Sequence, residues 1–377
     1  MIGVLDFADE TFRTDPWPLY AHHVAHDPVA WSPNLNCYFV FGYSNVRAVL
    51  TSPKFTTANP FRRTRTAIGI SVLDTDGDLH KQMRGAFLPA FRPAAVSHYA
   101  TTLVGPAVRR LLDEVLDSAK PNWLPEFAVR LPISVAAALL GLPAGDEQFL
   151  RLTMRPLVTF IDHGTVNYGT VVAHRDELKA YLHETMRRSA DVESLIGLLG
   201  AGGLSEAEVV ENALLALVAA TETTTSAITN VAARIFGQPG LFELLRGAPS
   251  LISAAVEETL RHEPPLHMTL RFATTEVSLG EHRLPAGSPV QVSLASANRD
   301  PSVYPEPDMW VLRRRFRAPL TFGAGPHHCL GSHLARVEIE TLIHELTRRF
   351  ESLEILSPAE PRPRGRTFRS VPDLVLG

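Results

Sequence analysis

Hydrophobic residues recur at helical spacing over most of the chain, and this pattern predicts a protein built mainly of helices. Near the C-terminus, Ile339, Leu342 and Leu346 lie three or four residues apart and therefore share one face of a helix. Comparable patterns predict further helices along the chain, at residues 44–51, 79–91, 95–118, 125–141, 145–158, 170–189, 204–236, 249–262 and 330–350.

Two stretches of β-forming residues predict small sheets beside these helices. Residues 28–42 read as a hairpin around "SPNLN", and short strands are expected within 270–293. The stretches 54–73 and 297–328 have no clean period, and long irregular segments in compact domains are often functional. We therefore predict an α+β fold dominated by helices. Since no linker divides the sequence, we expect a single domain over residues 1–377.

Composition narrows the possible partners and the compartment. The 377-residue chain has a net charge of −4, which argues against nucleic acid as a partner. Its N-terminus lacks a basic start followed by an apolar run, and no stretch of about 18 uncharged apolar residues occurs. The two cysteines, Cys37 and Cys329, suit a reducing compartment. We therefore expect a cytoplasmic monomer with no membrane contact.

The longest predicted helix, 204–236, contains a polar run that suits a helix interior poorly. Ser205 and Glu208 form a capping box at its start, and Gly237 marks its end. Within it, "AATETTTSA" (219–227) gathers four threonines, a serine and a glutamate, although β-branched and hydroxyl residues lower helix propensity. The run is either a solvent-exposed patch or a functional site. Apolar flanks on both sides favour a functional site.

The run "FGAGPHHCLGSHLAR" (322–336) places Cys329 in a glycine-rich turn before a helix. Amides at a helix N-terminus favour the thiolate form of such a cysteine. Three interpretations compete: a buried cysteine in a turn, a zinc site and a haem iron bound through the thiolate. A zinc site would use Cys329 with His327, His328 and His333, but side chains on so tight a turn rarely converge on one tetrahedral ion.

A family resemblance favours haem. The residues Phe322, Gly323, Gly325, His327, Cys329 and Gly331 resemble the haem-binding signature of the cytochrome P450 family, and Leu334-Ala335-Arg336 continues it. The likeness extends over roughly residues 10 to 377. It implies the cytochrome P450 fold, with haem b between a long distal helix and a proximal cysteine loop, and with Cys329 as the metal ligand.

A second motif, "EETLR", gives Glu258 and Arg261 one helical turn apart. Taken alone, such a pair is usually a surface ion pair. Its position about 70 residues before Cys329 makes it similar to the buried Glu–Arg pair of the family. The resemblance implies that Arg299, in "ANRDPSVYPEPDMW", joins this pair.

The resemblance also implies which residues surround the cofactor. Buried haem carboxylates need cationic partners. His80 and Arg84, four residues apart in "HKQMRGAFLPAF", are similar to the family's propionate-binding helix. Arg271 and His327 match the other two propionate partners. The alternative for each is a solvated surface charge. The remaining expected haem contacts come from the cysteine loop: Phe322, Gly323 and Gly331.

The polar run of the long helix resembles the distal motif of the family. Glu222 matches its acid and Thr223 its hydroxyl, a pair that delivers protons during oxygen activation. The family usually has glycine two residues before the acid, whereas this chain has Ala220, whose methyl group can crowd the oxygen pocket. Retention of both acid and threonine argues against a peroxide-dependent enzyme.

Electrons must reach the site from a separate protein, since no part of the sequence reads as a flavin or ferredoxin domain. We expect NAD(P)H to supply them through a ferredoxin or flavodoxin. A basic run before the cysteine loop is either a docking patch for such an acidic protein or a solvated cluster. It consists of Arg313, Arg314, Arg315 and Arg317.

The resemblance implies a mostly apolar substrate pocket. The residues expected to line it are Phe61, Ile70, Val72, Leu215, Ala219, Met268 and Phe368. Asp162, His163 and His267 are candidates for orienting a polar group. We therefore predict a monooxygenase acting on a small hydrophobic molecule such as a terpenoid or polyketide. A non-catalytic haem or lipophilic-ligand protein and a zinc hydrolase are the alternatives.

Overall fold

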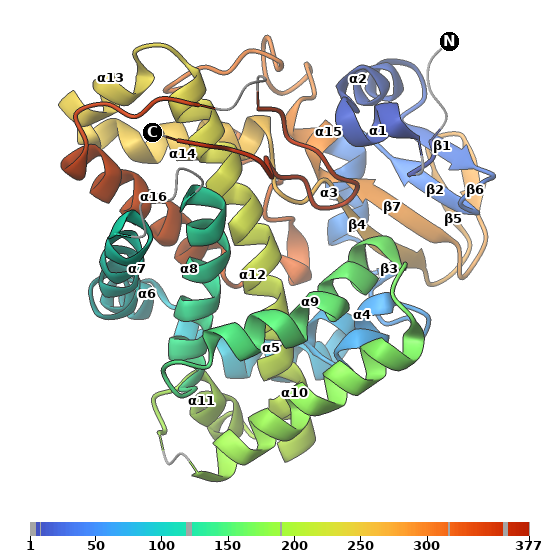
Figure 1. Ribbon diagram of the computed structural model, residues 1–377. Helices are drawn as coiled ribbons and strands as arrows, with labels where there is room; N and C mark the ends of the chain where they lie inside the picture. Colours follow the sequence, from blue (N-terminus) through green and yellow to red (C-terminus); the bar gives the residue numbers. More distant parts are fainter. Residues whose placement is uncertain are drawn as a thin grey trace. The chain divides into compact units, whose positions relative to one another are not determined.

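The protein is described here as a computed structural model, which covers residues 5–7, 9–117, 123–188, 191–315, 317–356 and 361–376 (Figure 1). By backbone contacts the chain forms two compact units. Unit 1 combines residues 1–57, 226–329 and 346–377, and unit 2 combines residues 58–225 and 330–345. Both units are assembled from segments far apart in the sequence.

Unit 1 contains the sheets. Its five-stranded sheet has the order β1-β2-β7-β4-β3, in which β2 and β7 are parallel and the other neighbours antiparallel. A separate hairpin is formed by β5 and β6. The predicted hairpin at 28–42 is confirmed as the pair β1–β2. The strands are β1 Val29–Ser32, β2 Cys37–Val40, β3 Phe55–Thr56, β4 Met268–Ala273, β5 Val277–Leu279, β6 His282–Leu284 and β7 Pro289–Ser293.

Six helices of the described chain lie wholly in unit 1. They are α1 Glu10–Thr14, α2 Trp17–His26, α3 Tyr43–Thr51, α13 Leu241–Gly247, α14 Ile252–His262 and α15 Leu294–Asn298. Two hydrophobic clusters cover the sheet. In one, Val46 and Val49 of α3 pack with Val290 and Val292 of β7. In the other, Phe39 and Met268 meet Tyr20 from α2. Side chains alternate between the two faces of β7 and of β4, so the apolar residues of each strand reach one of these two hydrophobic clusters.

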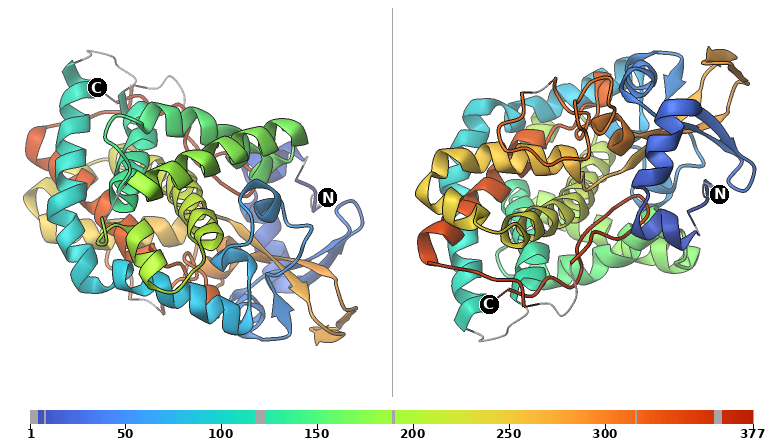
Figure 2. Two further views of the ribbon diagram at one scale, coloured as in Figure 1. Left: turned by 90° about the horizontal axis from the view of Figure 1, so that it is seen from below. Right: turned by 90° about the horizontal axis from the view of Figure 1, so that it is seen from above.

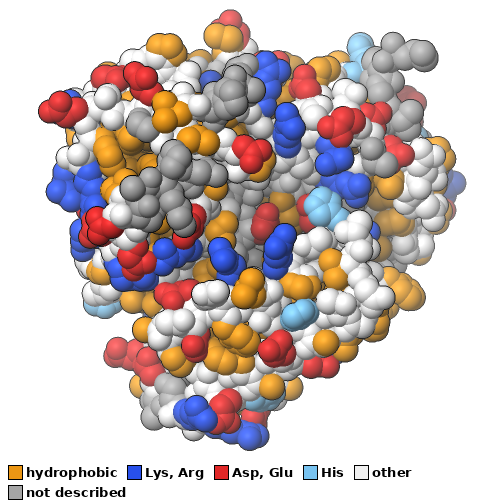
Figure 3. Space-filling view, in the orientation of Figure 1, with side chains coloured by type: hydrophobic (Ala, Val, Ile, Leu, Met, Phe, Trp, Pro, Cys, Tyr) orange, Lys and Arg blue, Asp and Glu red, His pale blue; other side chains and the backbone are white. Residues whose placement is uncertain are grey.

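Unit 2 is helical. Its helices are α4 Arg63–Ala67, α5 Gly77–Phe91, α6 Pro93–Tyr99, α7 Gly105–Asp117, α8 Trp123–Leu140, α9 Glu147–His163, α10 Tyr168–Arg188 and α11 Leu195–Ala201, with a π-helical turn at Ala100–Val104. The helices α9 and α10, green in Figures 1 and 2, pack against each other. Figure 3 shows hydrophobic side chains at the surface in this region, and the exposed residues of α9 and α10 include Leu152 and Tyr168.

Two helices supply residues to both units. Helix α12, Glu206–Gly237, has 32 residues, which corresponds to about 48 Å. The predicted capping box is present: the Ser205 amide donates to Glu208 Oε2 at 2.8 Å, and the Glu208 amide donates to Ser205 Oγ at 3.4 Å. Helix α16, Ser332–Arg349, follows the cysteine loop and buries Ile339, Leu342 and Leu346, as the apolar spacing predicts.

Helix α8 is long and apolar enough to cross a membrane, although it contains Glu126 and Arg130. Of its 18 residues, 72% are buried inside the protein. Core helices of globular proteins have the same length and hydropathy. The apolar residues of α8 are therefore accounted for by the core of unit 2, where Thr225 Oγ1 donates to the carbonyl of Ala128 at 3.0 Å.

The pattern of apolar residues identified the long helices but missed the short ones. α11 and α13 have seven residues each, too few for a helical period to stand out. The stretch 54–73, expected to be a loop, contains the short helix α4 and the two-residue strand β3. The segment 297–328 is irregular, as predicted, apart from a 3-10 turn at Gly325–His327.

One buried carboxyl group in α16 is unusual. Glu338 is 3% exposed, and its Oε2 has no hydrogen-bond partner among the described residues. Burial raises the pKa of Glu338 from 4.5 to about 8. The side chain is therefore protonated at neutral pH, because ionisation would place an uncompensated charge in the interior.

We expect Glu338 to make stability fall as pH rises. Between pH 4.5 and 8 the folded protein holds a proton that the unfolded chain has lost, so the free energy of unfolding should drop by roughly 3 kcal/mol over this window. Glu338→Gln should remove that part of the slope, while Glu340→Gln on the same helix should keep it. Urea unfolding at several pH values measures the slope, and equal slopes in all three proteins would contradict this account.

Candidate functional site

The cysteine loop is a tight turn fixed by backbone hydrogen bonds. The Cys329 amide donates to the Phe322 carbonyl at 3.0 Å, and the Gly323 amide donates to Leu320 at 2.9 Å. Gly323 and Gly325 have φ values of 74° and 71°, which side chains disfavour. A Cβ at Gly325 would also lie 2.6 Å from the Leu50 carbonyl oxygen. Glycine is required at Gly325, because the turn packs directly against the end of α3.

This turn presents an exposed cysteine. Cys37 is buried, and burial raises the pKa of its thiol to about 12, so it is inert. Cys329 is exposed, although cysteine is among the residue types most often buried in proteins. An exposed thiol at the end of a rigid glycine turn, just before helix α16, fits a single axial ligand to a metal carried by a cofactor.

The alternative of a protein-bound zinc ion is not supported. No group of three or more His, Cys, Asp or Glu side chains converges as a metal site in the described ranges. His327 is instead next to Thr57, whose Oγ1 lies 3.3 Å from His327 Nε2. The donor set around the turn is thus one sulfur, which suits haem iron, because the porphyrin supplies the other ligands.

The predicted propionate partners are distributed over both units. In unit 1, Arg271 of β4 is 5% exposed, and its Nη1 donates to Thr269 Oγ1 at 3.1 Å and to the Leu270 carbonyl at 2.9 Å. In unit 2, His80 is buried and Arg84 is partly buried, four residues apart on α5. Buried cations fit an anionic cofactor better than the alternative of solvated surface charges.

The polar run of α12 does not interrupt the helix. The helix is continuous from Glu206 to Gly237, and the threonine hydroxyls within it bond to carbonyls one turn earlier. Thr223 Oγ1 donates to the Ala219 carbonyl at 2.8 Å, and Thr221 Oγ1 donates to Leu217 at 2.7 Å. With its proton used in this way, the Thr223 oxygen is left with lone pairs that can accept a hydrogen bond.

Glu222 has a second carboxylate in its surroundings. Burial and, to a lesser degree, the charge of Asp162 raise the pKa of Glu222. Asp162 is at the end of α9, where His163 Nε2 lies 3.2 Å from its Oδ2 and Arg63 Nη1 donates to its carbonyl at 3.2 Å. Glu222 therefore retains a proton to higher pH than an ordinary glutamate, which suits a group that passes protons on.

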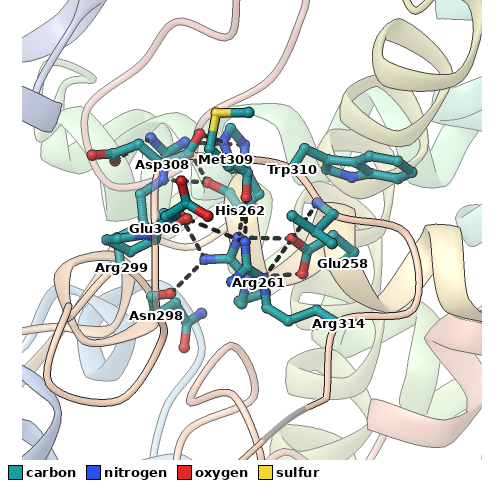
Figure 4. Close-up of polar contacts among 12 residues, drawn as sticks. Glu258, Arg261, His262, Asn298, Arg299, Glu306, Asp308, Met309, Trp310 and Arg314 are labelled. Carbon is teal, nitrogen blue, oxygen red and sulfur yellow. Dashed lines mark hydrogen bonds and ion pairs between the residues drawn. The ribbon is translucent and has the colours of Figure 1, made fainter.

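The Glu258–Arg261 pair is buried, as predicted (Figure 4). Both side chains have an exposed fraction of 0%, and Arg261 donates through Nε and Nη2 to the two carboxylate oxygens at 2.8 Å each. The same guanidinium donates to the carbonyls of Asn298, Pro307 and Met309. The pair thereby ties helix α14 to the irregular segment after α15.

The prediction that Arg299 joins this pair is wrong. The third side chain is Arg314, whose Nε donates to Glu258 Oε1 at 3.1 Å. Arg299 lies on the other side of α14, where its Nε donates to the His262 carbonyl at 2.9 Å and its guanidinium stacks 3.3 Å from the centre of the Trp17 ring. The segment after α15 turns back on itself, so the arginine farther along the chain reaches Glu258.

This result also corrects the predicted docking patch. The Arg314 side chain is 8% exposed and additionally donates to the carbonyls of Pro305, Glu306 and Met309, so it is not available to a partner. Arg313, Arg315 and Arg317 are exposed. The Arg317 guanidinium lies 5.0 Å from the centre of the Tyr43 ring.

Two of the predicted substrate contacts are corrected as well. Phe61 is 90% exposed, as expected of a surface side chain and not of a pocket wall. Met268 is 1% exposed and belongs to the core between β4 and α2. Strand residues alternate between faces, so Thr269, two residues before Arg271, shares its face of β4. The sequence analysis did not single out Thr269. Counting two residues back from Arg271 would have found it.

The other predicted contacts differ in burial. Val72 and Leu215 are buried, whereas Ile70 and Ala219 are exposed and Phe368 is half-buried beside Leu266. His267 does not orient a ligand: it is fully buried, its Nδ1 lies 3.3 Å from Tyr20 Oη, and burial lowers its pKa to about 4. It is thus a neutral structural residue.

Comparisons with known proteins agree with this geometry. The sequence profile described as "Cytochrome P450" matches residues 250–371. The chain is 30% identical to the cytochrome P450 monooxygenase PikC of Streptomyces venezuelae, over 96% of this chain and 92% of that protein. It is also 30% identical to nocardicin C N-oxygenase of Nocardia uniformis subsp. tsuyamanensis, over 90% of this chain and 89% of that protein. The crystal structure of CalO2 superimposes with a TM-score of 0.89 at 28% identity, covering 99% and 98% of the two chains.

The buried contacts of Glu258 with Arg261 and Arg314 predict that substitutions at neighbouring arginines differ sharply in their effect on stability. Arg314→Ala should lower the free energy of unfolding by about 3 kcal/mol, because it leaves a buried carboxylate with fewer partners. Arg315→Ala, at an exposed position one residue away, should change it by less than about 0.5 kcal/mol. Urea denaturation of the two variants measures both values, and equal effects would show that Arg314 does not stabilise the cluster.

Proposed function

Because this chain belongs to the cytochrome P450 family, and is accordingly a monooxygenase with a haem cofactor, we propose that it inserts oxygen into a hydrophobic natural product with electrons from a separate redox protein. The observation that carries the proposal is Cys329, exposed on a turn that glycine geometry makes rigid. A bound haem supplies the oxygen chemistry, and electron donation from a thiolate ligand favours cleavage of the O–O bond.

In this proposal the residues around the cofactor have separate tasks. Cys329 would bind the haem iron through its thiolate, and Phe322, Gly323 and Gly331 would allow the loop to approach the cofactor. His80, Arg84, Arg271 and His327 pair with the haem carboxylates, whose charges would otherwise be unpaired in the interior. This assignment is supported by the burial of His80 and Arg271.

Glu222 and Thr223 form the proton path. Since the Thr223 hydroxyl donates to Ala219, its oxygen can accept a hydrogen bond from water, and burial, with a smaller effect of Asp162, raises the pKa of the neighbouring Glu222. Ala220 adds a methyl group beside this pair, where the family usually has glycine. We propose that Glu222 supplies the proton and that the Thr223 oxygen, as a hydrogen-bond acceptor, orients the water that passes it to the reacting site.

The substrate is proposed to be an apolar molecule of natural-product size. Ile70, Val72, Leu215 and Ala219 of unit 2 supply an apolar lining, and the name of one relative, nocardicin C N-oxygenase, gives a small molecule as the compound that is oxidised. Epoxidation, desaturation and oxidative coupling at the same site are the alternatives to oxygen insertion into a C–H bond.

Electron transfer is proposed to depend on Arg313 and Arg315. Both are exposed on the segment that leads to the cysteine loop, in a chain whose net charge is −4. An acidic ferredoxin or flavodoxin in the cytoplasm, reduced at the expense of NAD(P)H, would be attracted to this local positive charge.

Thr223→Ala should uncouple oxygen consumption from product formation. The variant loses the hydroxyl oxygen that orients the proton-carrying water, so NADH consumption with a surrogate ferredoxin and reductase should continue, product per NADH should fall roughly tenfold and peroxide should rise. Thr223→Ser, which keeps the hydroxyl, should retain most of the coupling. The ratio of product to NADH measures this. Substrate-independent NADH consumption with no product in the unmodified protein would instead favour a non-catalytic haem protein.

Charge reversal at the two exposed arginines should weaken reduction by an acidic ferredoxin. We expect the double substitution Arg313→Glu and Arg315→Glu to raise the KM for ferredoxin about tenfold at low salt, with a difference that shrinks at high salt because screening removes steering. Chemical reduction by dithionite should be unaffected. Ferredoxin titrations at two ionic strengths measure the effect, and an unchanged KM at low salt would contradict the docking site.

A further inference from the structure

Two neighbouring side chains of α12 hold the backbone of the loop that carries Ile70 and Val72. Glu211 Oε2 accepts a hydrogen bond from the Ile70 amide at 3.0 Å, and Asn212 Oδ1 accepts one from the Val72 amide at 2.9 Å. Asn212 Nδ2 donates to the Glu208 carbonyl at 2.8 Å, which fixes the orientation of the Asn212 amide. The loop is therefore positioned by side chains of the helix.

The contact is close enough to require glycine next to it. Gly69 has a φ of 118°, and a Cβ at this position would lie 2.2 Å from Glu211 Oε1. Any other residue at position 69 would displace the Glu211 carboxylate and strain the backbone. The loop thus approaches α12 as closely as a backbone can while both amides remain hydrogen-bonded.

A lysine from a third element completes the arrangement. Lys179 Nζ of α10 donates to Glu211 Oε1 at 2.7 Å, and the two side chains are 22% and 21% exposed. The carboxylate therefore uses one oxygen for the loop and the other for α10. Charge-assisted hydrogen bonds at partly buried positions are stronger than ordinary surface contacts. Glu211 connects α10, α12 and the loop.

The position of this connection on α12 relates it to the proposed chemistry. Glu211, Leu215, Ala219 and Thr223 follow at intervals of four residues, so each is the neighbour of the next, and the row winds by about 120° around the helix from Glu211 to Thr223. Glu211 is at one end of this row and Thr223 at the other, about 18 Å apart along the axis. The two residues between them are the ones proposed to line the substrate pocket.

We propose that Glu211, Asn212 and Lys179 are positioning residues that set substrate length. By fixing the Ile70 and Val72 backbone at the end of the row opposite Thr223, they form the far wall of the substrate chamber on α12. A substrate lying along α12 can then extend no more than about 18 Å from Thr223 to this wall. The proposal rests on the proposed function, and it names the substrate class as elongated apolar molecules with an upper length limit.

A matched control is available in the same pair of helices. His183 Nδ1 of α10 lies 2.9 Å from Glu206 Oε1 of α12, so Glu206 also links α10 to α12 but does not hold the loop. Comparison of Glu211→Ala with Glu206→Ala therefore separates loop positioning from the general loss of an ion pair between these helices. Asn212→Ala is a second variant that removes the Val72 contact and leaves the Glu211–Lys179 ion pair in place.

The first readout is amide hydrogen exchange in the haem-loaded protein. Glu211→Ala should accelerate exchange at Ile70, and Asn212→Ala at Val72, each by roughly tenfold or more, because each variant removes the acceptor of that amide. Glu206→Ala should leave both amides at the rate of the unmodified protein. Unchanged exchange in Glu211→Ala and Asn212→Ala would overturn the positioning role.

The second readout is binding of 1-alkylimidazoles with chains of increasing length, followed by the absorption shift on haem coordination. In the unmodified protein and in Glu206→Ala, affinity should rise with chain length and then stop rising at one length. In Glu211→Ala this cut-off should move to longer chains. Faster exchange with an unchanged cut-off would overturn the specificity role. No absorption shift in any of the proteins would overturn the proposed function itself, and with it the chamber.

Discussion

The buried carboxylate of Glu258 is the interaction on which the geometry of unit 1 depends. It accepts hydrogen bonds from Arg261, from Arg314 and from the Val311 amide. Through these two guanidinium groups it also organises carbonyls of the segment between α15 and the cysteine loop. An unpaired carboxylate in this position would be very costly, so the segment can fold only in the arrangement that supplies these donors.

The buried side-chain amide of Asn298 links these contacts of Glu258 to the cysteine loop. Asn298, whose carbonyl accepts from Arg261, receives a hydrogen bond from the Leu320 amide at 2.6 Å and donates to Thr321 Oγ1 at 2.8 Å. Leu320 in turn accepts from the Gly323 amide. A chain of hydrogen bonds thus leads from Glu258 to the turn that presents Cys329, and the position of the sulfur is set by packing more than 70 residues earlier in the sequence.

The sequence predicted the long helices and the glycine turn well, because both depend on local patterns. Helical periods, the capping box at Ser205 and the glycine turn around Cys329 are each specified within a few residues. The sequence-based prediction failed where a contact depends on the course of the chain between residues far apart in the sequence. Arg299 and Arg314 are both arginines of one irregular segment, and only the folded path shows which one reaches Glu258. Met268 was misplaced by one residue, which in a strand means the opposite face.

Sequence patterns also could not predict the hydrogen bonds from the Ile70 and Val72 amides to Glu211 and Asn212, since the partners are about 140 residues apart. Helix α12 thus holds the loop at Ile70 and Val72 near its N-terminal end and carries Glu222 and Thr223 farther along.

The measurement that tests the central claim most directly is the absorption spectrum of the reduced protein with carbon monoxide. If Cys329 is the axial ligand, the Soret band lies at the long wavelength that distinguishes thiolate-ligated haem, and Cys329→Ser loses it. A histidine-type band in the unmodified protein, or an unchanged band in Cys329→Ser, would contradict the assignment of Cys329 and the site built around it.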